Sequence, residues 1–247
     1  MSYINAENLI KHYGTGDALV QAVRGISFAI EEGEFVAVMG ESGSGKSTLL
    51  SMMGALNTPT KGNFLVDDIN IYSLSRDQRA DFRREFLGFV FQNFNLIPYL
   101  TLAENVMLPL VTIKARNSRK KEMAVEALHR VGLGDKVNRL PSQVSGGEQE
   151  RVAVARAIVN NPPILLADEP TGNLDSKTSG DIMGLLKKLN TEGMTIIMVT
   201  HSEGSARSAR RILRIQDGHL VEEERSVGNA ATVESIRSGF SVAPAAS

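Results

Sequence analysis

Hydrophobic residues gather in short continuous runs along this chain, with little alternation between apolar and polar positions. The runs at 164–167 and 195–199 predict central parallel strands that are buried on both faces of a sheet. A run at 35–39 follows the turn-forming pair Gly33-Glu34 and predicts another buried strand. Residues 86–91 make a further short apolar run. The pattern favours the α/β fold class.

Helical patterns and turn signals lie between these runs. Residues 48–56 carry a helical pattern that stops near a Pro at position 59. Residues 101–132 are rich in helix signals, with a break predicted at Pro109 and a basic turn at 114–121. Near the end, Asp217-Gly218 separates two apolar segments and predicts a closing hairpin.

The order of these segments predicts a strand–helix core that is interrupted by a helical insert. We expect one domain over 1–225, with core segments at about 1–92 and 161–225 and a helical subdomain at about 93–160. Beyond residue 225 the chain becomes small and polar, so a loosely held tail is expected over 226–247.

Composition narrows the possible functions. Of 247 residues, 42% are hydrophobic, and 27 Lys and Arg stand against 28 Asp and Glu. Without excess positive charge, nucleic acid is not an expected partner. The chain has no cysteine, which excludes disulfides, thiol catalysis and cysteine-bound zinc. We find no secretory signal and no apolar stretch near the ~18 residues that span a bilayer, so we expect a soluble, cytoplasmic protein.

A glycine-rich loop follows the strand predicted at 35–39 and fits the pattern G-x-x-x-x-G-K-[ST]. Its residues, here called the phosphate loop, are Gly40, Glu41, Ser42, Gly43, Ser44, Gly45, Lys46, Ser47 and Thr48. Backbone N–H groups of such a loop approach phosphate oxygens, and the helix N-terminus adds positive charge. Lys46 would reach the β and γ phosphates, and Ser47 would coordinate Mg²⁺. Chance gives this pattern in on the order of one per cent of chains this long.

Two acids end the strand predicted at 164–167. Parallel sheets bind ligands at this end of their strands. Asp168 suits a role in holding Mg²⁺, and Glu169 suits a role in activating an attacking water. Alternation along a strand points the two side chains in different directions. Adjacent acids can also merely solvate a loop, but the phosphate loop favours the catalytic interpretation.

A second glycine turn lies about 100 residues downstream. Ser145, Gly146, Gly147 and Glu148 match a helix capping box, and helical residues follow until Pro162-Pro163. One interpretation is only a well-capped helix. The other uses the same groups as an anion site, in which the glycines expose N–H donors and the helix dipole attracts phosphate. We call residues 145–148 the signature turn.

These motifs together resemble the nucleotide-binding subunits of ABC transporters, whose signature usually reads L-S-G-G-Q. Here Val144 replaces the Leu and Glu148 replaces the Gln. The resemblance covers about residues 4–221 and implies a P-loop core of the RecA type, an antiparallel β portion and an inserted helical subdomain. It further implies ATP and Mg²⁺ as ligands, and two copies that close head to tail, the phosphate loop of one against the signature turn of the other.

The resemblance assigns further residues. Tyr13 lies where the family stacks an aromatic ring on adenine, Gln92 where an amide reaches Mg²⁺ and the attacking water, and His201 where a switch histidine contacts the γ phosphate. The stretch 173–175 resembles the loop that touches the opposite subunit. Each has a plainer alternative: an edge-strand Tyr, a loop Gln, a local turn and an unremarkable His.

Several stretches resemble the lipoprotein-release and macrolide-export branch, among them 88–92, 95–98 and 104–110. That likeness implies an integral membrane permease as partner and a peripheral place on the cytoplasmic face of the inner membrane. Two alternatives stay open: a regulatory ATPase that signals through a membrane partner, as in cell-division relatives, and a soluble ABC ATPase of DNA repair or translation. The motifs alone do not separate the first alternative from a transporter.

Two surface features bear on a partner. Six of the 13 aromatic residues fall between Phe82 and Tyr99, and of these we expect about half in the core, with Phe94 and Tyr99 lining a groove for a short helix of the permease. The basic residues between Lys114 and Lys121 are expected mainly to be a solvated helix face, with anionic membrane contact as the lesser alternative.

Overall fold

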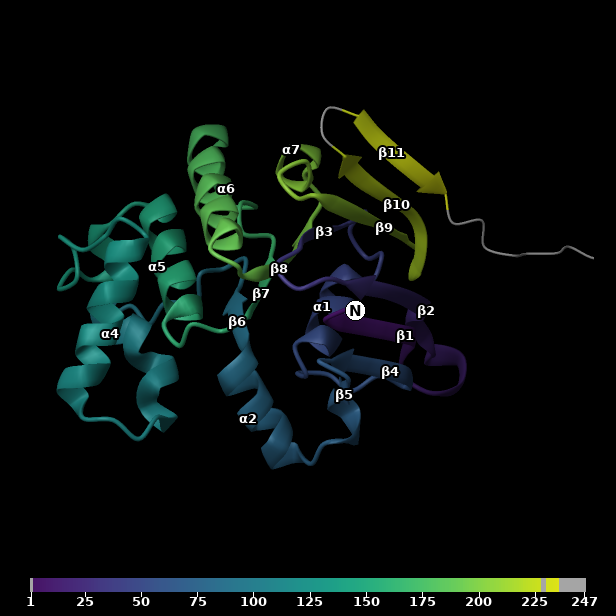
Figure 1. The fold of residues 1–247 in the computed structure, drawn as a ribbon, viewed down its shortest axis with the longest axis horizontal. Coiled ribbons are helices and arrows are strands. Elements are labelled where there is room, and N and C mark those ends of the chain that lie inside the picture. Colours follow the sequence, from purple (N-terminus) through teal and green to yellow (C-terminus); the bar gives the residue numbers. More distant parts are fainter. Residues whose placement is uncertain (1, 228–229, 236–247) are drawn as a thin grey trace, which may run out of the picture.

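The computed structural model of the protein describes residues 2–227 and 230–235. A mixed β-sheet runs through the molecule (Figure 1). In the described part of the chain its strands are β3 (Phe35–Met39), β6 (Leu87–Val90), β7 (Ile164–Asp168), β8 (Thr195–Thr200), β9 (Arg211–Gln216), β10 (His219–Val227) and β11 (Ala230–Ser235). Their order is β11–β10–β9–β3–β8–β7–β6. Strands β9, β3, β8, β7 and β6 run parallel, whereas β10 and β11 pair antiparallel.

Strand β3 explains why the apolar runs lack alternation. All five of its residues are buried. Phe35, Ala37 and Met39 join one hydrophobic cluster, and Val36 and Val38 join a second cluster on the opposite face of the sheet. Because both faces are covered, apolar residues are favoured at every position of the strand. The predicted central parallel strands are confirmed.

A smaller antiparallel sheet covers one side of the core. Its strands are β1 (Ile4–Tyr13), β2 (Val20–Ile30), β4 (Lys61–Val66) and β5 (Ile69–Asn70), in the order β2–β1–β4–β5. Helix α1 (Lys46–Met53) contributes Leu49, Met52 and Met53 to the hydrophobic cluster that this sheet shares with the central sheet. The N–H of Arg24 on β2 donates to the carbonyl of Gly218 at 2.8 Å and so joins the two sheets at the β9–β10 turn.

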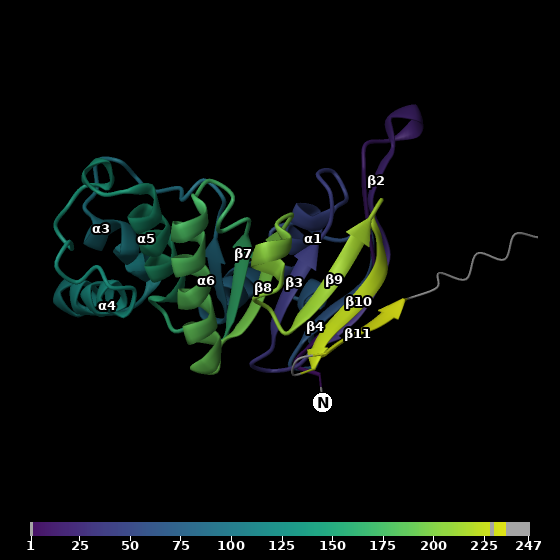
Figure 2. The ribbon, with the colours of Figure 1, turned by 90° about the horizontal axis from the view of Figure 1, so that it is seen from above.

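Helices at the other end of the molecule connect β6 to β7 (Figures 1 and 2). They are α3 (Leu102–Met107), the 3₁₀ turn η3 (Leu108–Thr112), α4 (Asn117–Arg130), the 3₁₀ turn η4 (Pro141–Gln143) and α5 (Gly146–Ile158). The short turns η1 (Gly16–Ala18) and η2 (Ile71–Ser73) lie earlier in the chain, and α2 (Arg76–Phe86) leads into β6. Helix α6 (Ser176–Thr191) follows β7, and α7 (Glu203–Ala206) follows β8.

Three predictions differ from the observed elements. The helix expected at 48–56 spans Lys46–Met53, because Gly45 in a left-handed conformation begins it two residues earlier. The basic turn expected at 114–121 is largely the start of α4. The tail expected from 226 instead carries the end of β10 and, from 230 to 235, strand β11. Backbone groups of β10 make that pairing, so the composition of the segment gave little sign of it. Residues 228–229 and 236–247 lie outside the described residues.

Candidate functional site

The phosphate loop connects the buried end of β3 to α1. Gly45 has φ +103°, and a Cβ there would come within 2.2 Å of the Ala22 carbonyl oxygen, so only glycine fits without movement. The Gly218 N–H donates to the Ser44 carbonyl at 3.0 Å, so the β9–β10 turn braces the loop from outside. Ala22 and the β9–β10 turn therefore both lie against the phosphate loop.

Lys46 is buried beneath this loop, whereas Ser47 is exposed beside it. Lys46 is only 7% exposed, and its Nζ donates to the carbonyl oxygen of Glu41 at 2.7 Å. Ser47 Oγ donates to Asp168 Oδ1, at the end of β7, at 3.4 Å. Burial raises the pKa of Asp168, Glu169 raises it further, and the Ser47 hydroxyl and Lys46 lower it. A buried cation beside a hydroxyl and a carboxylate oxygen fits a phosphate with its hard divalent cation.

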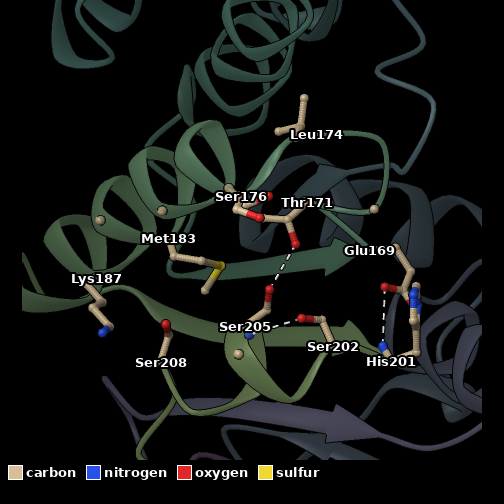
Figure 3. Close-up of a pocket in the computed structure, with 15 residues that line it drawn as sticks. Glu169, Thr171, Leu174, Ser176, Met183, Lys187, His201, Ser202, Ser205 and Ser208 are labelled. Atoms are coloured by element: carbon tan, nitrogen blue, oxygen red, sulfur yellow. Dashed lines mark hydrogen bonds and ion pairs between the residues drawn. The ribbon is translucent and has the colours of Figure 1, made fainter.

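Glu169 is turned away from Asp168, as expected. Its φ of +48° is unusual for a residue with a side chain. Oε1 of Glu169 lies 2.8 Å from Nδ1 of His201, and Oε2 accepts the His201 N–H at 3.3 Å (Figure 3). An ionised carboxylate only accepts, so Nδ1 of His201 carries the shared proton. A neutral His201 must therefore leave Glu169 before it can donate to a phosphate.

Glu169 and His201 lie between two cavities. One, of about 670 Å³, is lined by the phosphate loop together with Gln92. The other, of about 620 Å³, lies between α6 and α7 and is lined largely by Ser and Gly residues, with Leu174 and Lys187 (Figure 3). Both cavities include Glu169 and His201 in their walls. The pair therefore faces the phosphate loop on one side and an open surface on the other.

Gln92 reaches the phosphate-loop cavity from a segment held by the side chains of Asn173 and Arg156. The sequence alone identifies the stretch 173–175 but not this contact, and it does not single out Arg156. Asn173 Nδ2 donates to the Gln92 carbonyl at 2.9 Å. Arg156 of α5 donates to the carbonyls of Phe94 and Asn95 at 2.5 and 2.6 Å, where both residues have φ near +50°. No local pattern marks such contacts, because Arg156 lies 61 positions beyond Asn95.

The signature turn forms the predicted capping box at the start of α5. Oε2 of Glu148 accepts from the N–H of Ser145 at 2.8 Å and from its hydroxyl at 3.1 Å, and the Glu148 N–H donates to Ser145 Oγ. Lys136 pairs with the other carboxylate oxygen. That bond and the contacts from Ser145 lower the pKa of Glu148 to about 2. Glu148 thus points back over the cap and stays ionised.

The two glycines of the signature turn differ. A Cβ at Gly147 would lie 2.2 Å from Cγ2 of Thr178 on α6, and Gly147 is buried. A Cβ at Gly146 would meet only Leu174, at 3.8 Å. Helix packing therefore requires a glycine at position 147, whereas position 146 has room for a side chain. That both glycines expose N–H donors to an anion stays a prediction.

The structure brings most, not all, of the expected site residues together. Within the described residues, the lining of the phosphate-loop cavity includes neither the signature turn nor Tyr13. Tyr13 is 41% exposed at the end of β1, with its hydroxyl bonded to Asn57 and Lys11 over its ring. Its place beside adenine stays a prediction. Asp175 caps α6 through the N–H groups of Lys177 and Thr178, the local role that was the plainer alternative.

A third cavity, of about 420 Å³, lies at the junction of β6, η3 and α5. Its apolar lining includes Phe89 and Phe91, whose stacked rings have centroids 5.7 Å apart. Its charged lining residues are all arginines. The expectation that Phe94 and Tyr99 line a groove is wrong for this cavity: neither is in its walls, and Tyr99 is 78% exposed. Alternate residues of β6 and its extension face the cavity, which the sequence alone did not resolve.

This chain is similar to known proteins whose names describe ATP binding and transport. The profile of the ABC transporter family matches residues 23–172. An uncharacterized ABC transporter ATP-binding protein of Methanocaldococcus jannaschii is 50% identical over 219 residues, which cover 89% of this chain and 98% of that protein. The macrolide export ATP-binding/permease protein of Syntrophobacter fumaroxidans is 47% identical over 238 residues, 94% of this chain. This chain spans about a third of the length of that protein.

Solved structures of an ATP-binding cassette are also similar to this chain. An ATP-binding cassette that is dimeric in a post-hydrolysis state, bound to ADP and Pi, superposes with a TM-score of 0.83 at 45% identity. The match covers 91% of this chain and 99% of that one. A second dimeric structure of that cassette gives the same TM-score at 46% identity, over 91% of this chain and 99% of that one.

Proposed function

The chain belongs to the ABC transporter family, and on that premise we propose that it is the ATP-hydrolysing subunit of an export-type transporter that drives a membrane permease by closing as a pair. The fold is that of an ABC ATPase, and ATP hydrolysis is its activity. The observation that carries the proposal is the meeting of the phosphate loop, Asp168, Glu169 and His201 at one edge of the sheet.

We assign the phosphate contacts to the loop backbone and to Lys46. The cavity volume of about 670 Å³ and the buried Lys46 support this assignment. Ser47 and Asp168 would hold Mg²⁺, with Gln92 as a further oxygen donor. When bound, Mg²⁺ supplies positive charge that offsets the charge developing on the transferred phosphoryl group.

Glu169 is the proposed general base. It lies at the cavity wall, its side chain is only 12% exposed, and His201 contacts both of its oxygens, one through the ring and one through the backbone N–H. Glu169 would accept a proton from the attacking water, and His201 would turn to the phosphate once its bond to Glu169 opens. The contact from Asn173 to the Gln92 carbonyl positions the amide of Gln92 at the same wall.

We infer a head-to-tail pair because, among the described residues, one chain alone brings no signature turn to its phosphate-loop cavity. A second copy can bring Ser145 and Gly146 to that cavity, with the terminal phosphate at the N-terminus of α5. Structures of the similar cassette are dimeric, which supports the arrangement. We place the α6–α7 cavity on the closing surface, because Leu174 and His201 both line it.

The groove between β6, η3 and α5 is the proposed permease site. Its mixed apolar and arginine walls suit a short amphipathic helix that carries acidic residues. Within the described residues, each helix is too short or too polar to cross a bilayer. We therefore propose that the chain is peripheral on the cytoplasmic face of the inner membrane, and that its membrane contact runs through the permease.

A mixing experiment tests the shared site. In a Glu169→Gln background, which preserves bound ATP, we expect MgATP to convert monomers to dimers in light-scattering chromatography. Adding Lys46→Met or Ser145→Arg should abolish dimers when each variant is alone. An equal mixture of the two should recover dimers, because one of its two shared sites remains intact. Recovery identifies a head-to-tail pair.

Two outcomes would overturn the proposal. A Glu169→Gln chain that stays monomeric with MgATP contradicts ATP-driven closure. A mixture that stays monomeric while the Glu169→Gln chain dimerises contradicts the shared site. The membrane protein that copurifies tests the transport role separately: a partner without a transport path would favour the signalling alternative.

A further inference from the structure

The hydroxyl of Ser145 is occupied within its own chain. A serine hydroxyl has one proton to donate. In the structure that proton points to Oε2 of Glu148 at 3.1 Å, while the Glu148 N–H donates to Ser145 Oγ at 3.3 Å. To donate to a phosphate, Ser145 must therefore turn its proton away from Glu148. The N–H of Ser145 remains on Oε2 at 2.8 Å and keeps the cap in place.

The carboxylate of Glu148 lies over the cap of the same helix N-terminus that a phosphate is expected to approach. An ionised carboxylate in the first turn suits the helix dipole, but it repels a second anion at the same N-terminus. The ammonium of Lys136 pairs with Oε1, the oxygen that makes no contact with Ser145. The Glu148 side chain is 16% exposed, so solvent screens the charge only in part.

Lys136 comes from the loop between α4 and η4 and not from α5. The Lys136 N–H donates to the carbonyl of Leu133 at 3.0 Å, and the Arg139 N–H donates to the Lys136 carbonyl at 2.9 Å. These backbone bonds fix the point from which the side chain reaches Glu148. A separate element thus supplies the positive charge that the signature turn lacks.

We infer that Lys136 is a positioning residue for the signature turn: it holds the Glu148 carboxylate back over the cap and offsets its charge, so that Ser145 and the start of α5 can receive the terminal phosphate of ATP bound to a second copy. The inference rests on the proposed head-to-tail closure. Its particular claim is that Lys136 acts through Glu148 and not by touching the phosphate.

A double-variant comparison tests this claim in the Glu169→Gln background. The measured quantity is the MgATP concentration that gives half-maximal dimer. With Glu148 present, Lys136→Met should raise that concentration about tenfold, one unit of the logarithmic affinity scale. With Glu148→Gln present, where no charge needs an offset, Lys136→Met should change it less than about twofold. Lys136→Arg should behave like the parent, because it keeps the charge.

Lys188→Met, which removes an exposed lysine of α6, controls for net charge, and thermal unfolding confirms that each variant is folded. An equal loss in both backgrounds would overturn the inference, because Lys136 would then contact the phosphate or support the loop. An unchanged concentration for Lys136→Met would overturn it as well. If the Glu169→Gln parent itself fails to dimerise, the proposed function is wrong and this inference falls with it.

Discussion

The phosphate loop and the signature turn are both glycine turns at helix N-termini, yet they differ in what they contain. The phosphate loop has its own buried cation, Lys46, and a carboxylate partner across the sheet in Asp168. The signature turn has a carboxylate, Glu148, and takes its cation from a distant loop. The first is a nearly complete anion site, whereas the second becomes one only when its carboxylate is neutralised. The difference agrees with the proposal that the phosphate loop binds nucleotide first and that the signature turn receives it from a second copy.

Near each of the two turns, a hydrogen-bond donor is bonded to a carboxylate of the same chain. Nδ1 of His201 is bonded to Glu169 in the phosphate-loop half, and the Ser145 hydroxyl is bonded to Glu148 in the signature half. Each donor must exchange a carboxylate for a phosphate. Both donors are exposed, so in the isolated chain water can replace either carboxylate at little cost.

The largest expected effect lies in the phosphate-loop half. Glu169→Gln removes the proton acceptor, so ATP turnover should fall about 10²- to 10⁴-fold. Phosphate release under saturating MgATP measures it, with Glu126→Gln, an exposed acid of α4, as the control. Turnover at the parental rate would show that another group is the base.

Lys46→Met should weaken ATP binding by the monomer by about 2 kcal/mol, roughly 30-fold, because a charge-assisted contact to phosphate is lost. Titration with a fluorescent ATP analogue measures the change, and Lys188→Met is the matched control. If the two variants bind equally well, the buried lysine of the phosphate loop is not what holds the nucleotide.

Gly147→Ala tests the structural glycine of the signature turn. Its Cβ would meet Cγ2 of Thr178, so the free energy of unfolding should fall by about 1–2 kcal/mol. Thr178→Ser removes the clashing methyl but keeps the hydroxyl that bonds Asp175, and should restore most of the loss. Urea unfolding measures both. Gly146→Ala, with open space at its Cβ, should change stability little; an equal loss there would remove the distinction between the glycines.

Glu150 gives a pH dependence of stability. It is fully buried on α5, and in the described part of the chain neither of its oxygens has a hydrogen-bond partner. Burial raises its pKa to about 8, while Arg156 lowers it. The unfolded chain loses this proton near pH 4.5 and the folded chain near 8, so stability should fall as pH rises between these values.

Glu150→Gln removes that titration. Relative to the variant, the unmodified chain should lose about 3 kcal/mol of stability between pH 5 and pH 8, because each unit of pKa difference corresponds to about 1.4 kcal/mol. Urea unfolding at three pH values in this range measures the difference. A difference that stays constant across the range would contradict the burial of an ionisable Glu150.

Much of the fold could be predicted from the sequence, and the reasons are local. Burial on both faces of the sheet is visible in the continuous apolar runs of β3, β7 and β8. The pair Asp217-Gly218 is likewise a local turn signal. Strand β11 was missed because its pairing uses the backbone of β10. In the site, the phosphate loop and Glu169 carry local signals, and the capping box predicted where Glu148 points. Lys136 and Arg156 could not be found, because each acts on a residue of another element. Asn173 lies in the identified stretch 173–175, but its contact with Gln92, 81 positions away, could not be predicted.

Helix α5 begins at the signature turn and carries Arg156 near its other end. Arg156 lines the groove proposed for the permease and also holds the carbonyls of Phe94 and Asn95. The 11 positions between Ser145 and Arg156 span about 16 Å of continuous helix. A hydrogen-bonded helix resists compression and transmits displacement along its axis. If the permease binds the proposed groove, this single continuous helix joins it directly to the N-terminus that we propose receives the phosphate of a second copy.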